Sequence, residues 1–501
     1  MITFRAASFF LLSLPLFAAD FQNGQAARAV FGQSSFTSHD TGIQISSLVV
    51  TQNRLFAADT SRHILTFDVN LLGNLRDDRG QHSTGGCSLC FPAPVSQTNE
   101  SVMPGVASVS VWGKTVAVAD AANHRVLIWR DSSAPRPDRG PDVILGRLSE
   151  SSSLGASTLV DPVSVALDGK RVFVGDVALH RILFWNSLPL TDDQPADGVL
   201  GQSDFVSSRA VDAPGPDTVA TPVAMTSDGF NLFVADSTAR RVLMFSPGDM
   251  PLAPNALVNS ASLNGGALAP GTLVTLHANN LTETLQAQAP DTGEPLPRRL
   301  GGVEIILDGQ PLPLLMVSPT ELQAQLPYDI AGRTGASLYL RLEHSSNVLV
   351  TPAIAVKLTA ASPGVFAFGD REPRAALALH VAQPDQTSGG TPVTDDSPAA
   401  PGEVITLWAA GLGTVLESGT TVAGKPHEGP PALVANPVSA QINGQAAQVV
   451  SASLPGGSVG VYWIKVVVPP DVVPGSTAYL SISQNGLTSN AVKLAVGPAP
   501  R

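Results

Sequence analysis

The stretch VAVADAANHRVLIW at Val116–Trp129 decides the fold of the N-terminal half of the chain. An apolar run ends in Asp120, a small polar segment follows, and Arg125 opens a second apolar run, which predicts strand, tight turn and strand. The same phrase returns three times, as LFAADTSRHILTF at Leu55–Phe67, VFVGDVALHRILFW at Val172–Trp185 and LFVADSTARRVLMF at Leu232–Phe245. The aspartates shared by the four copies lie 61, 56 and 60 residues apart, at Asp59, Asp120, Asp176 and Asp236. A near-constant period of this size indicates a repeat architecture.

Each copy belongs to a longer unit of four short strands. A further apolar run precedes it, and the connecting turn is Asp168-Gly169 in one unit and Asp228-Gly229 in another, a dipeptide that favours hairpins. A fourth apolar segment ends in glycine and a polar residue, as at Ala29–Gln33, Val143–Arg147 and Val199–Gln202. Repeated four-stranded units predict the blades of a β-propeller, here with about four blades. The last copy stops at Phe245, so we expect the spare strand near Ala29–Phe36 to complete it and close the ring.

The segment PVSVALDGKRVFVGDVALHRILFW resembles an NHL-type propeller repeat, and ADAANHRVLIW matches that family most closely. The resemblance covers roughly residues 25–247 and implies a propeller of NHL-like blades. The first and fourth copies depart from the family pattern, because Ser61 replaces the asparagine and Arg240 replaces the histidine.

Polar side chains recur at fixed positions of the repeat. Asp59, Asp120, Asp176 and Asp236 are joined by His63, His124 and His180, each next to an arginine. These residues would either form a ring of ligands around a channel or satisfy turn backbone groups within their own blades. We favour the structural role, because buried polar groups must find partners. The sequence therefore predicts no catalytic residue, metal site or cofactor.

The C-terminal half is a second duplication. PGTLVTL at Pro270–Leu276 matches PGEVITL at Pro401–Leu407, and VEIILDGQPLP at Val303–Pro313 matches VSAQINGQAAQ at Val438–Gln448. Each copy holds about seven short strands spaced by turns, which is typical of an antiparallel β-sandwich. We expect one sandwich at 254–360, a linker or irregular start of the second module at 361–400, and a second sandwich at 401–501. Asp395-Asp396 in the linker could bind a cation, although paired acids in such a loop are mostly hydrated.

This half resembles the uncharacterised C-terminal module of many secreted bacterial proteins, and its opening is similar to the Ig-like IPT/TIG fold. The phrases that carry the resemblance are NSASLNGGALAPGTLVTLHANNL, SPGVF, PGEVITLWAAGLGTV and VGVYWIKVVVP. It spans about Asn255–Val496 and implies fold and location, not an activity.

The first residues, MITFRAASFFLLSLPLFAAD, have the layout of a secretory signal peptide over residues 1–19. An uncleaved anchor is the alternative, although the apolar run is shorter than the roughly 20 residues of a membrane span. The two cysteines, Cys87 and Cys90 in GGCSLCFP, predict a local disulfide that pins a loop in an exported protein. Free thiols or a metal or redox site are the alternatives. We therefore expect a secreted or cell-surface protein, with a periplasmic location as the other choice.

Composition narrows the functional classes. The net charge is −12 and no basic cluster stands out, so we do not expect nucleic acid to be a partner. Neither a HExxH zinc motif, a P-loop, a GxSxG elbow nor a dinucleotide fingerprint occurs.

Our first hypothesis is an exported, non-enzymatic binding protein whose propeller recognises a protein or glycan of the envelope or extracellular matrix. Its sandwiches would serve as spacer or surface attachment. The alternative is an exported propeller enzyme, a metal-assisted lyase or hydrolase with its site at the channel mouth. A third reading makes the C-terminal pair an export or sorting signal.

Overall fold

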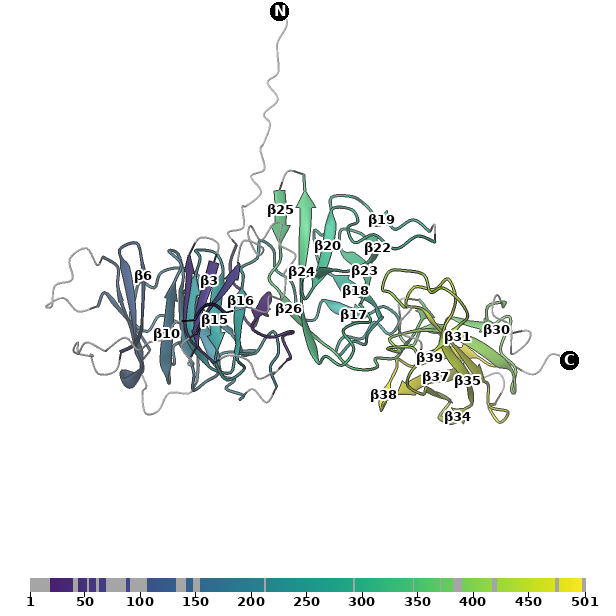
Figure 1. Ribbon diagram of the computed structural model, residues 1–501. Helices are drawn as coiled ribbons and strands as arrows, with labels where there is room; N and C mark the ends of the chain where they lie inside the picture. The colour runs from purple at the N-terminus through teal and green to yellow at the C-terminus, as the bar shows by residue number, and fades with distance from the viewer. Residues whose placement is uncertain are drawn as a thin grey trace, which may run out of the picture.

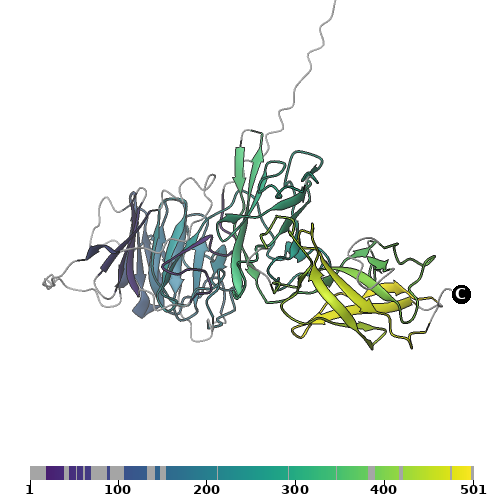
Figure 2. The ribbon, with the colours of Figure 1, turned by 45° about the vertical axis from the view of Figure 1, so that its right-hand side comes forward.

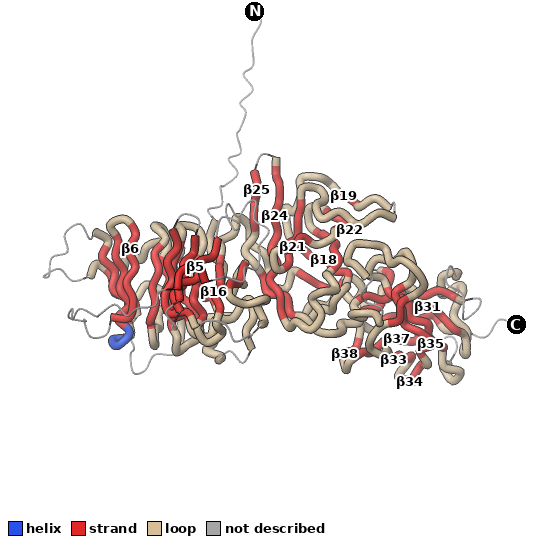
Figure 3. The backbone as a smooth tube through the Cα atoms, viewed as in Figure 1, coloured by secondary structure: helices blue, strands red, loops and turns tan. Residues whose placement is uncertain are grey.

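A computed structural model describes the chain in fifteen segments: residues 19–38, 44–51, 54–59, 63–68, 87–90, 106–131, 141–146, 154–210, 213–291, 293–345, 347–369, 371–381, 390–416, 421–473 and 477–497. The expected all-β class is confirmed, with several antiparallel sheets. The helical element of these segments is one 3-10 turn, η2 (Ala121–Asn123), which is the blue stretch in Figure 3. The predicted signal peptide lies outside the described residues, except for Ala19.

The N-terminal half forms four four-stranded sheets. Sheet 1 has the order β2 (Ile45–Thr51), β3 (Arg54–Asp59), β4 (His63–Asp68), β5 (Cys87–Cys90). Sheet 2 has the order β6 (Val106–Trp112), β7 (Thr115–Asp120), β8 (Arg125–Trp129), β9 (Val143–Leu145). Sheet 3 has the order β10 (Pro162–Leu167), β11 (Val172–Asp176), β12 (Arg181–Trp185), β13 (Gly198–Leu200). Sheet 4 has the order β14 (Pro222–Ser227), β15 (Leu232–Asp236), β16 (Arg241–Phe245), β1 (Ala29–Phe31).

The four sheets are copies of one structure. In each, the register between the first two strands shifts after the first residue of the first strand, for instance between Pro162 and Ser164 in sheet 3. Sheet 4 takes its outer strand from the start of the chain, because β1 pairs antiparallel with β16 and Val30 lies opposite Leu243. The spare N-terminal strand therefore completes the fourth copy, as the sequence predicted.

Neighbouring sheets pack face to face through buried apolar cores. One core joins sheets 2 and 3, a second joins sheets 3 and 4, and a third joins sheets 4 and 1. The first strands also adjoin in this order, β6 beside β10, β10 beside β14 and β14 beside β2. Figure 1 shows the four sheets gathered at one end of the molecule. At these three junctions, each sheet buries apolar residues on the face that it turns to its neighbour.

The C-terminal half contains two units of two sheets each. In the first two-sheet unit, one sheet has the order β17 (Leu257–Asn259), β18 (Leu273–His277), β23 (Glu321–Gln325), β22 (Leu314–Val317), β19 (Ala287–Gln288). The other has the order β21 (Gln310–Pro311), β20 (Val303–Leu307), β24 (Gly335–His344), β25 (Asn347–Val350), with β26 (Ile354–Lys357) on β24. Both sheets contribute to one core.

The second two-sheet unit repeats this plan. One sheet has the order β27 (Gly364–Val365), β31 (Val404–Ala410), β36 (Tyr462–Val467), β35 (Val449–Leu454), β32 (Ala432–Leu433), with β30 (Ala378–His380) on β31. The other has the order β28 (Ala367–Phe368), β29 (Ala375–Ala376), β39 (Val492–Ala495), β37 (Thr477–Gln484), β33 (Ser439–Ile442), β34 (Gln445–Ala447), with β38 (Leu487–Thr488) on β37. The strands β27–β30, which fall between residues 364 and 380, thus pair within the sheets of the second unit.

The first two-sheet unit lies between the four sheets and the second unit (Figures 1 and 2). Arg28 fastens it to the N-terminal half: its guanidinium donates to the Thr351 carbonyl oxygen at 2.6 Å and lies 4.7 Å from the centre of the Tyr339 ring. On the other side, the Tyr328 and Tyr462 hydroxyl oxygens are 3.4 Å apart, and both rings are buried. Burial raises the pKa of both tyrosines, so they stay neutral at this junction.

Candidate functional site

Two of the repeat aspartates, Asp176 and Asp236, hold loop backbone. Asp236, at the end of β15, accepts hydrogen bonds from the Ala220 and Thr221 N–H groups at 3.0 and 2.9 Å. Asp176 does the same for Val160 and Asp161, at 3.0 and 2.9 Å. Burial raises the pKa of Asp176, and these N–H groups oppose that effect. Each carboxylate thereby fixes the loop that leads into the first strand of its own sheet.

Asp120 has a different set of partners. It accepts hydrogen bonds from Arg125 Nε at 2.8 Å and from the Asn123 side chain at 2.8 and 3.0 Å. Burial raises the pKa of Asp120, but the Arg125 and Asn123 hydrogen bonds outweigh it, and the pKa lies below its usual value. This carboxylate is therefore ionised at neutral pH and is hydrogen-bonded to both side chains.

The arginines that open the third strands of sheets 3 and 4 tie loops together. Arg241 is fully buried and donates to Asp236 at 3.0 Å, to the Phe36 carbonyl oxygen at 2.8 Å and to the Thr218 carbonyl oxygen at 2.7 Å. Arg181 is equally buried and donates to the Thr158 carbonyl oxygen at 2.8 Å. These guanidinium groups act as structural cross-links.

Two of the repeat histidines, His124 and His180, connect adjacent sheets. His124 Nδ1 lies 2.5 Å from the Val160 carbonyl oxygen, and His180 Nδ1 lies 2.6 Å from the Ala220 carbonyl oxygen. Both acceptors belong to the loop that enters the next sheet. We had expected contacts within one unit, but these two contacts join neighbouring units. Both histidines and Arg240, which replaces histidine in the fourth copy, have a left-handed backbone with φ of 56°, 51° and 52°.

For four predicted site residues only the backbone is described. Asp59 ends β3, His63 begins β4, and Cys87 and Cys90 lie in β5; their side chains are outside the described residues. The cysteine stretch is thus a strand and not the expected loop. A disulfide needs Cα atoms within about 7 Å, and two residues three apart in a straight strand are about 10 Å apart. The Cys87–Cys90 disulfide stays a prediction that requires a bent β5.

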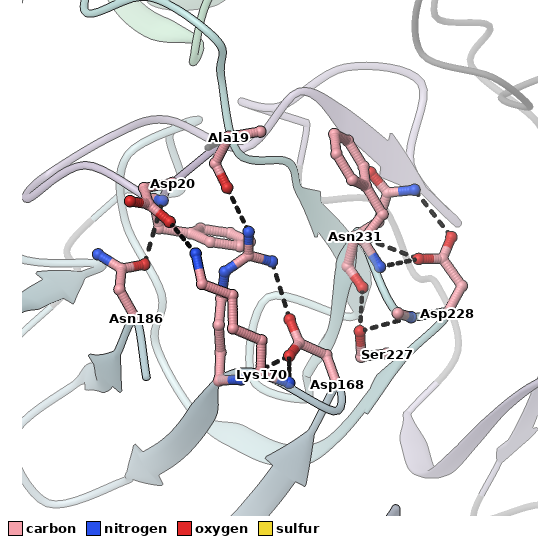
Figure 4. A network of polar contacts seen from close by, with 12 residues as sticks. Ala19, Asp20, Asp168, Lys170, Asn186, Ser227, Asp228 and Asn231 are labelled. Carbon is pink, nitrogen blue, oxygen red and sulfur yellow. Dashed lines mark hydrogen bonds and ion pairs between the residues drawn. The ribbon is translucent and has the colours of Figure 1, made fainter. Parts of the chain in front are cut away.

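The Asp-Gly turns gather at the opposite end of the sheets, under the first residues of the structure (Figure 4). Asp168 accepts hydrogen bonds from the Lys170 and Arg171 N–H groups, and Arg171 pairs with it at 2.8 Å. Lys170 reaches Asp20 at 2.7 Å, and Arg171 donates to the Ala19 carbonyl oxygen. The N-terminal segment is therefore fixed across the turn of sheet 3.

Trp112 occupies the same end, where β6 turns into β7. A Cβ atom added at Gly169 or at Gly229 would come within 3.0 Å of the indole, so the ring lies against the turns of both sheet 3 and sheet 4. The side chain is nevertheless 40% exposed, and Phe230 beside Gly229 is exposed as well. We call Trp112 and Phe230 the aromatic turn patch.

Sequence reasoning missed this patch. Trp112-Gly113 stands at the repeat position of Asp168-Gly169 and Asp228-Gly229, so tryptophan replaces the turn aspartate in one copy. That departure from the repeat was the available signal. A ring of ligands was the alternative role for the repeat histidines. The described residues hold no group of three histidine, cysteine, aspartate or glutamate side chains that could bind a metal.

Comparison with known proteins assigns no family. No family description and no curated protein matches the chain. Among solved structures, the designed protein Ika4 is 15% identical, with a TM-score of 0.17, over 44% of this chain and 97% of its own. The glutaminyl cyclase of Myxococcus xanthus is 11% identical, with a TM-score of 0.18, over 44% and 90%. The designed protein Ika8 is 12% identical, with a TM-score of 0.16, over 88% and 100%. TM-scores this low establish no shared fold.

In the described segments, no helix has the length and apolar character needed to cross a membrane.

Proposed function

We propose that this protein is an exported binding protein whose N-terminal half has a non-enzymatic role. Its four N-terminal sheets would form an NHL-type β-propeller that presents the aromatic turn patch to a protein or glycan. The two C-terminal units would be Ig-like sandwiches that serve as spacer or surface attachment.

Two observations support the propeller proposal. Neighbouring sheets pack face to face through apolar cores, and one apolar face on sheet 1 and one on sheet 2 are exposed. Val109 and Val111 of sheet 2 are 57% and 59% exposed, whereas the residues at the same repeat positions in sheet 3, Val165 and Leu167, are 2% and 4% exposed. On sheet 1, Val49 is exposed too. Among the described residues, no apolar core joins sheets 1 and 2. A closed ring would bring these two apolar faces together, as at the other three junctions.

The binding proposal depends chiefly on Trp112. An exposed indole that lies against two glycine turns is a rigid apolar surface, and tryptophan is enriched at the centre of binding sites. Its flat face suits an apolar protein side chain or the C–H face of a sugar ring. An enzymatic alternative would use His124 and His180. Nδ1 of each contacts a backbone carbonyl oxygen in the loop of the neighbouring sheet, which favours a binding role.

Binding to glycan arrays and to extracted envelope proteins tests the proposal. The full chain should bind a discrete partner, and Trp112→Ala together with Phe230→Ala should weaken that binding by tenfold or more. Phe368→Ala is the matched control, since Phe368 is also an exposed aromatic side chain but lies in the second two-sheet unit. Absence of any partner, or equal loss with Phe368→Ala, would refute a role for the aromatic turn patch.

A further inference from the structure

Three side chains at one edge of the second two-sheet unit form a connected polar row. Ser397 Oγ lies 3.2 Å from His380 Nε2, and His380 Nδ1 lies 2.5 Å from Glu403 Oε1. A hydroxyl, an imidazole and a carboxylate in this order are the arrangement that activates a serine nucleophile. The row lies far along the chain from the aromatic turn patch and has no part in the binding role proposed above.

The hydrogen bonds assign the protons of the row. A carboxylate only accepts, so Nδ1 of His380 donates to Glu403 and, in the neutral ring, Nε2 carries the lone pair. That lone pair is within hydrogen-bond distance of the Ser397 hydroxyl. The neutral ring with its proton on Nδ1 is the tautomer that a general base for Ser397 requires.

Backbone contacts fix each member of the row. His380 ends β30, and its N–H donates to the Thr391 carbonyl oxygen at 2.9 Å. Glu403 precedes β31, and its Oε2 accepts the Ala400 N–H at 2.7 Å. The Ser397 N–H donates to the Thr394 carbonyl oxygen at 3.1 Å. These bonds hold the backbone of His380 and Ser397 and one carboxylate oxygen of Glu403 in place.

His380 Nε2 also lies 3.0 Å from the carbonyl oxygen of Ser397. A carbonyl oxygen only accepts, so this contact becomes a hydrogen bond when Nε2 has received the Ser397 proton. Ser397 itself is exposed, and the neighbouring Asp395 and Asp396 are exposed as well. The hydroxyl is open to a substrate, and the two carboxylates disfavour an anionic one.

We propose that Ser397 is a nucleophile, activated by His380, for acyl transfer from uncharged or cationic esters. The hydroxyl proton passes to His380 Nε2 while Oγ forms a bond to the ester carbonyl carbon. The carbon–oxygen bond to the leaving alcohol then breaks, and the alcohol leaves with the proton from Nε2. Water hydrolyses the resulting acyl-serine by the same route and releases the acid. Glu403 is a positioning residue that holds the ring.

The experiment uses the full chain with p-nitrophenyl acetate, followed by peptide mass mapping. A burst of about one nitrophenolate per chain and an acetyl group on Ser397 are expected. Ser397→Ala should abolish both, and His380→Ala should slow acylation by roughly a hundredfold or more, with partial recovery on adding imidazole. Glu403→Gln should lower the acylation rate while leaving the half-saturating ester concentration unchanged.

Ser345→Ala is the control, because Ser345 is an exposed serine that bonds a carboxylate directly, Glu283 at 2.8 Å, without a histidine between them. Its acylation behaviour should equal that of the unmodified chain. Acetylation spread over several serines, acetylation independent of His380, or the lack of a burst in folded protein would each overturn the proposal.

Discussion

A single substitution, Asp308→Asn, should stabilise the first two-sheet unit at neutral pH. Asp308 lies in the β20–β21 turn, donates its N–H to the Ser337 carbonyl oxygen at 2.8 Å and accepts the Ser337 N–H at 2.7 Å. Asn443 occupies the same turn of the second unit and makes the same pair of bonds with Tyr479, both at 2.8 Å. The duplication therefore shows that an amide can replace this carboxylate without loss of either hydrogen bond.

Burial sets the size of the effect. It raises the pKa of Asp308 from 3.8 to about 6, against the opposing effects of the Ser337 N–H and Arg333. A shift of about two units corresponds to about 3 kcal/mol, because each unit is worth about 1.4 kcal/mol. The folded state binds this proton more tightly than the unfolded state, so the stabilisation is complete below pH 3.8 and is lost as the pH rises through 6. The shift already includes Arg333, and we expect Asp308→Asn to gain about 1–3 kcal/mol at pH 8.

Hydrogen exchange of β24 measures this gain locally, which avoids unfolding all units together. The opening free energy of the Ser337 amide should fall between pH 4 and pH 8 in the unmodified chain and stay level in Asp308→Asn. Asn443→Asp is the matched control: Asn443 is exposed, so a carboxylate there should leave the free energy within about 0.5 kcal/mol. Equal stability of Asp308→Asn and the unmodified chain at pH 8 would show that the buried carboxylate is not costly.

Four further substitutions test the N-terminal half by thermal and urea unfolding. Arg241→Met should lower the free energy of unfolding by about 3–5 kcal/mol, because it leaves a buried carboxylate without its partner. Arg125→Met, at the same repeat position but partly exposed, should cost about 1 kcal/mol or less. Similar losses in the two variants would contradict the structural role of the buried pair. Arg28→Ala should cost about 2–4 kcal/mol, the sum of a charged hydrogen bond and a cation–π contact, and should expose residues 249–257 to protease; an unchanged cleavage pattern would argue against this clasp. Val109→Asp should cost about 2 kcal/mol or more if the ring closes in solution, since a charge would enter an apolar junction, and a change below about 0.5 kcal/mol would mean that this face stays open.

Much of the architecture could be predicted from the sequence alone, because local sequence patterns determine it. Alternating apolar runs and Asp-Gly or Asn-Gly turns specify hairpins within a few residues, and repetition multiplied that signal. The spare strand at Ala29–Phe31 was also predictable, since the fourth copy lacked an outer strand and β1 supplies it. The duplicated Asp308 and Asn443 turns reappear as equivalent strand pairs for the same reason.

What depends on distance in the sequence was decided only by the tertiary structure. The partner of His180 lies 40 residues away in the next sheet, and that of Arg28 lies 323 residues away, so no local pattern could name them. The same holds for Trp112, whose neighbours are glycines in two other units. Hairpins form from neighbouring residues by hydrogen bonding and turn geometry, whereas the packing of one sheet on another brings together side chains whose sequence separation is arbitrary.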